Sequence, residues 1–248
     1  MTFTACKKED TILPPNDNLT IYNSNCTLSF SEQNIADIGL VHNKLILDLF
    51  ENYNFSASDR LFELKNQFIL MHPELPPFVV DSLISNATKT YNQGFNVNVI
   101  EFSSLQLVSM NYNKLHNLID TSSSIINLNI GLDLLKIQTI SSLSCVDRYF
   151  LLTWIEVARK SAVLWTPINQ GGQGLLSKIY GKFNSFPPDI TRAHPYWKLV
   201  IAADITGAAG GFMAMGIGLG IPGTNVGVAC LIGYEAGYGS AMAAALCR

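Results

Sequence analysis

The fold is decided by the last fifth of the chain, which reads WKLVIAADITGAAGGFMAMGIGLG (197–220), IPGTN (221–225) and VGVACLIGYEAGYGSAMAAALCR (226–248). The two long segments are built almost entirely from apolar and small residues. Pro222 and Gly223 lie between them and favour a tight turn, because proline fixes φ and glycine accepts the left-handed conformation. The stretch therefore predicts a helical hairpin over about residues 197–246.

Glycine and alanine recur every four residues in both segments, which places them on one face of each helix. A face without bulky side chains lets another helix approach closely. Glycine costs about 1 kcal/mol relative to alanine inside a helix, so a glycine-rich helix needs a packing reason. The positions that we assign to this glycine-zipper packing face are Gly207, Gly211, Gly233, Gly237 and Ala241.

Three interpretations of the hairpin stay open: it is buried within the protein, it inserts into a membrane, or it associates with another copy. Each arm approaches the roughly 20 residues that a membrane span requires. Asp204 and Glu235 are the only charged residues in 199–247 and would be costly at membrane depth. We treat both as candidate functional polar residues and expect Asp204 to meet Lys198, Arg192 or water.

The middle of the chain, residues 31–190, is predicted to form a helical, bundle-like body. Apolar residues recur at helical spacing, and capping patterns and prolines mark the ends of the segments. The expected helices are about 32–52, 56–70, 77–92, 98–119, 125–141, 144–165 and 175–182. The sequence thus predicts an all-α protein with an N-terminal tether (1–30), a body (31–190) and a C-terminal hairpin (191–248).

Residues 1–10, MTFTACKKED, carry a second signal. Phe3-Thr4-Ala5-Cys6 resembles a bacterial lipobox, and the following KKED resembles a charged tag of some surface-exported lipoproteins. The resemblance implies that Cys6 is a lipid anchor, that residues 11–30 are a polar tether, and that the protein lies in the bacterial cell envelope, at the outer membrane or cell surface. Only five residues precede Cys6, whereas a signal peptide needs an apolar run of roughly 7–15 residues, so a cytoplasmic location is the alternative.

The Gly/Ala-rich hairpin is also similar to the hydrophobic region of bacteriocins and their immunity-associated peptides. The similarity covers about a fifth of the chain and implies membrane activity without carrying over any functional residue. The double-glycine leader of those peptides is missing from this sequence.

The usual signatures of catalysis, cofactor binding and metal binding are missing. Gly218–Gly223 matches GxGxxG, but too little chain follows it to complete a dinucleotide-binding unit, and it is better interpreted as a turn. The five cysteines have no zinc-ligand spacing, and a net charge of −3 without a basic block excludes nucleic acid as an expected partner. We therefore expect no cofactor and no metal.

His42 and its neighbour Asn43 are the remaining polar candidates, since His42 falls on the apolar stripe of its helix. A buried, hydrogen-bonded histidine is the simpler interpretation, and a metal-binding or catalytic role is the alternative.

The function expected from the sequence is a non-enzymatic, lipid-anchored envelope protein whose hairpin mediates packing or association with a partner or another copy. A membrane-active, bacteriocin-like effector is the first alternative, and an enzyme with a site assembled by the tertiary fold is the second.

Overall fold

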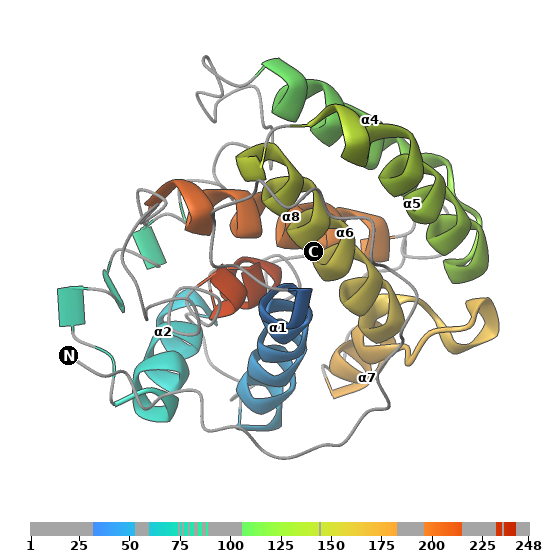
Figure 1. Cartoon of the computed structure of the whole chain (residues 1–248). Helices are drawn as coiled ribbons and strands as arrows, with labels where there is room; N and C mark the ends of the chain where they lie inside the picture. Colours follow the sequence, from blue (N-terminus) through green and yellow to red (C-terminus); the bar gives the residue numbers. More distant parts are fainter. Residues whose placement is uncertain are drawn as a thin grey trace.

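The computed structural model is all-α, as the sequence predicts (Figure 1). It describes residues 32–52, 60–73, 75, 77–78, 80–81, 84–85, 88, 106–143, 145–182, 196–214, 232–234 and 236–241. No strand occurs in these ranges. The residues expected to form the tether and the Pro222–Gly223 turn lie outside them.

Most helices begin and end close to the boundaries predicted from periodicity and capping signals, whereas the expected starts at 56 and 98 lie outside the described residues. The helices are α1 (Glu32–Asn52), α2 (Arg60–Met71), α4 (Gln106–Thr121), α5 (Ile125–Thr139), α6 (Cys145–Trp165), α7 (Leu175–Lys182) and α8 (Tyr196–Ala214), with short 3₁₀ turns η2 (Ile140–Ser142) and η3 (Ile168–Gln170). Residues 77–78, 80–81, 84–85 and 88 are also helical, as are 232–234 and 236–241, which we call the C-terminal helical segment.

Three consecutive serines connect α4 to α5 and reverse the direction of the chain. The Ser122 hydroxyl and amide both donate to the Leu118 carbonyl and satisfy the end of α4. The Ser124 hydroxyl accepts from the Asn127 amide and caps the start of α5. With so short a connection the two helices pack as antiparallel neighbours, and Gly131 of α5 lies against Leu118 of α4.

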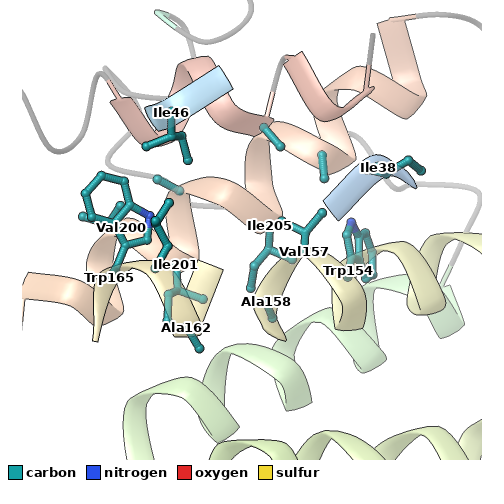
Figure 2. Packing of buried hydrophobic residues seen from close by; sticks show 14 of the residues in the cluster. Ile38, Ile46, Trp154, Val157, Ala158, Ala162, Trp165, Val200, Ile201 and Ile205 are labelled. Atoms are coloured by element: carbon teal, nitrogen blue, oxygen red, sulfur yellow. The ribbon is translucent and has the colours of Figure 1, made fainter. Parts of the chain in front are cut away.

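The centre of the molecule is the stack of α1, α6 and α8 (Figure 1). Figure 2 shows Trp154, Val157, Ala158, Ala162 and Trp165 of α6 packed with residues of α1 and α8. The labelled residues from those two helices are Ile38, Ile46, Val200, Ile201 and Ile205. Small side chains on α6 let α8 approach it closely, and every side chain of α8 described from Val200 to Ala208 is buried.

The C-terminal helical segment belongs to the same hydrophobic cluster as the body. A Cβ atom on Gly233 would lie 2.9 Å from the Ile38 carbonyl oxygen, and one on Gly237 would lie 3.0 Å from the His42 carbonyl oxygen. These glycines thus bring the segment against the backbone of α1. On the adjacent face of the segment, Tyr234 and Tyr238 pack edge-on against Phe68 of α2.

Candidate functional site

Asp204 of α8 is the centre of a polar cluster in the apolar stack. Its side chain is fully buried, and so is that of His42 on α1. His42 Nε2 lies 3.2 Å from Asp204 Oδ1, and the hydroxyl of Ser161 on α6 donates to Asp204 Oδ2. The carboxylate therefore joins all three helices of the central stack.

Asn43 fixes the orientation and tautomer of His42. The Asn43 side-chain amide donates through Nδ2 to the Lys160 carbonyl of α6 at 3.1 Å, so its oxygen faces His42. Asn43 Oδ1 lies 2.8 Å from His42 Nδ1, and an amide oxygen only accepts, so Nδ1 carries a proton. His42 consequently faces Asp204 with Nε2, either as a donor or as a lone pair.

The contact between His42 and Asp204 is close but is not an aligned hydrogen bond. His42 Nε2 and Asp204 Oδ1 lie 3.2 Å apart, and neither atom makes a hydrogen bond to any described group. The hydrogen bond to the carboxylate comes from the Ser161 hydroxyl, while the imidazole lies against its other oxygen. Such neighbours matter because burying a polar or charged group is costly unless it is paired.

The cluster contains serine, histidine and aspartate, but it is not connected as a hydrolytic triad. In such a triad the serine hydroxyl donates to histidine, and aspartate binds the far ring nitrogen. Here the Ser161 proton goes directly to Asp204, the far nitrogen of His42 binds Asn43, and all three triad residue types are completely buried. The arrangement can hold helices together; it cannot deliver an activated hydroxyl to a substrate.

A second polar chain links α8 to α4. Thr206 Oγ1 donates to the Ala202 carbonyl at 2.7 Å, so it accepts from the Tyr112 hydroxyl, also 2.7 Å away. Tyr112 in turn accepts from His116 Nε2 at 2.9 Å. The direction of every hydrogen bond in the chain is thereby set, and His116 carries its proton on Nε2.

Burial shifts the two titratable groups of this second chain. Desolvation raises the pKa of the Tyr112 phenol well above its ordinary value, and the hydrogen bond to Thr206 opposes this only in part. Desolvation also lowers the pKa of His116, opposed by the nearby negative charge of Asp120. Both side chains are therefore neutral near pH 7, as their hydrogen bonds require.

The structure brings together some of the residues singled out in the sequence. His42, Asn43 and Asp204 belong to one cluster. Gly233 and Gly237 face α1, Gly207 and Ala241 are buried, and Gly211 lies within α8. Cys6 and Glu235 lie outside the described residues.

The partners of Asp204 were not found by sequence reasoning. Lys198 instead donates to the Asp120 carbonyl at the end of α4, and Arg192 lies outside the described residues. Ser161 carries no local signal of its role, since a serine in a helix is normally unremarkable. Only its position two turns of helix from Trp154 and one from Trp165, on the buried side of α6, hints that its hydroxyl needs a partner.

No family model, curated protein or solved structure matches the chain. Among the described residues, no group of three or more histidine, cysteine, aspartate or glutamate side chains could hold a metal ion. None of the described helices combines the length and the apolarity needed to cross a membrane.

Proposed function

We propose that this protein is a non-enzymatic, lipid-anchored component of the bacterial cell envelope, and that its Gly/Ala-rich C-terminal helices serve to pack the anchored body. Cys6 is the anchor, and the residues up to about 30 are the tether. The helical body is held away from the membrane surface by this tether and acts by association with other molecules.

The observation that carries the packing role is the close approach of Gly237 to the His42 carbonyl. His42 is the residue that binds Asp204, so the C-terminal helical segment lies directly over the connection between α1 and α8. Small residues at that position allow the segment to cover the polar cluster. The same cluster argues against a hydrolytic site at Asp204, since its serine is buried and bound to a carboxylate.

The anchor is tested in native cells by fractionation, acyl-label incorporation and mass measurement of the mature N-terminus. We expect a membrane-bound protein that begins at an acylated Cys6, and loss of label and of membrane attachment on Cys6→Ala. Cys26→Ala is the matched control, since it removes another cysteine of the N-terminal region and should retain the label. Label that survives Cys6→Ala, or a mature chain that keeps Met1, would disprove the anchor.

The bacteriocin-like effector remains the competing proposal, and it requires the C-terminal helices to leave the body. Dye release from vesicles by the purified full chain would support it, provided that release is lost on Gly237→Leu. Absence of release from vesicles at both neutral and acidic pH would leave the packing role as the better account.

A further inference from the structure

The outer face of α5 is a continuous apolar stripe. Ile126, Ile130, Leu134 and Ile137 are 51–71% exposed, although α5 already buries Ile125, Leu128, Leu132 and Leu135 on its inner side. Spacings of four, four and three residues confine the exposed set to an arc of about 80°. We call these four residues the α5 stripe. A helix that is apolar on both sides is normally covered on both sides.

From this surface we infer that the α5 stripe is a self-association site, which pairs antiparallel with the same stripe of a second copy. The four positions are nearly symmetric about the middle of the helix. A two-fold axis there places Ile126 of one copy opposite Ile137 of the other, and Ile130 opposite Leu134. Each side chain of the stripe thus meets a side chain of the stripe, which is the requirement of a two-fold interface.

The charges beside the stripe favour a second copy. Asp133 is exposed at the edge of the stripe and is paired with Arg159 of α6, so two copies do not bring bare carboxylates together. Lys136 is the only other charged residue of α5, and with Asp133 it leaves the helix neutral. A helix that binds an anionic membrane surface carries a basic polar face, which α5 lacks.

The exposed apolar area of the α5 stripe is the size expected for a weak dimer. The exposed parts of the four side chains amount to roughly 400 Å² per copy, within the range of the largest apolar patch on a typical monomer, which is often functional. Two copies with their polar rims would reach the low end of specific interfaces, where association is reversible. We therefore expect a dimer that forms in the micromolar range, and attachment to a surface would raise the local concentration further.

The test is sedimentation velocity of the purified full chain, under reducing conditions, from micromolar to hundreds of micromolar. Ile126→Glu and Ile137→Lys each place a charge against an apolar partner and should weaken the dimer at least tenfold. The double variant should recover most of the affinity, because the antiparallel register sets the introduced carboxylate opposite the introduced amine. Both single changes suit the helix dipole, so the fold should be retained, which circular dichroism and the thermal unfolding midpoint will check.

Ile168→Lys is the matched control, because Ile168 is 71% exposed on η3, away from α5, and should leave the dimer unchanged. Cys6→Ala should leave it unchanged too, which separates this inference from the proposed anchor. A wild-type chain that stays monomeric throughout would overturn the inference. So would a double variant no stronger than the single variants, or a monomer that binds phosphatidylcholine vesicles only when the stripe is intact.

Discussion

Helices α8 and α5 have the least amphipathic sequences among the described helices, yet neighbouring helices cover them to different extents. α8 packs on α6, which contacts α1 as well, and every side chain described from Val200 to Ala208 is buried. α5 lies against α4 and α6 on one side, and its opposite stripe faces water. The one charge of α8 between Val200 and Ala208 is fully buried and bound, whereas the charges of α5 lie at the surface.

The difference shows that an evenly apolar helix requires neighbours that cover it on every side. In α8 the requirement is met within the chain, by neighbouring helices and by the C-terminal helical segment. In α5 it is met only on the inner side, which leaves the stripe for a second copy.

The largest expected effect comes from removing the buried carboxylate. Asp204→Ala leaves His42 and Ser161 buried without their partner, and it should lower the free energy of unfolding by about 3–5 kcal/mol. Asp133→Ala removes a carboxylate from the exposed pair with Arg159 and should cost less than about 1 kcal/mol. Urea denaturation of both variants measures the two losses. Equal losses would contradict the distinction between α8 and α5.

A smaller loss of stability is expected from adding a side chain where the C-terminal helical segment contacts α1. A Cβ on Gly237 would lie 3.0 Å from the His42 carbonyl oxygen and 3.1 Å from Leu45 Cδ2, so Gly237→Ala should cost about 1–2 kcal/mol through overpacking. Gly239→Ala is the matched change, since its nearest described atom would be 3.8 Å away. Its helix propensity should contribute up to about 1 kcal/mol of added stability. Thermal unfolding that moves in the same direction for both variants would show that this segment does not pack as described.

The smallest effect is a change in pH dependence. Burial lowers the pKa of His116 below its ordinary value of 6.5, so below that value the unfolded chain binds more protons than the folded one. Stability is therefore lost as pH falls from about 6.5 towards the folded pKa. Glutamine can donate to Tyr112 without titrating, so His116→Gln should flatten this part of the curve. Urea midpoints of the wild type and the variant, measured near pH 7.5 and near pH 5.5, check this prediction. If the midpoint changes equally with pH in both proteins, the pH dependence belongs to other groups.

Much of the fold could be predicted from the sequence because its signals are local. The periodicity and capping signals predicted helix ends near residues 119 and 165 and a start at 125, and α4 ends at Thr121, α6 at Trp165 and α5 begins at Ile125. The cluster around Asp204 could be predicted only in part. His42 and Asp204 were each singled out for their polarity in apolar segments, but 162 residues separate them, and no local pattern records that α1 lies beside α8.

The sequence by itself determined the all-α class and most of the helix boundaries, since each depends on neighbours within one or two turns of the chain. The tertiary structure alone decided which apolar surfaces are covered. It placed the described part of the C-terminal segments inside the body and gave Asp204 two buried partners. It also left the outer face of α5 in water, because α4 and α6 cover only the other side of that helix.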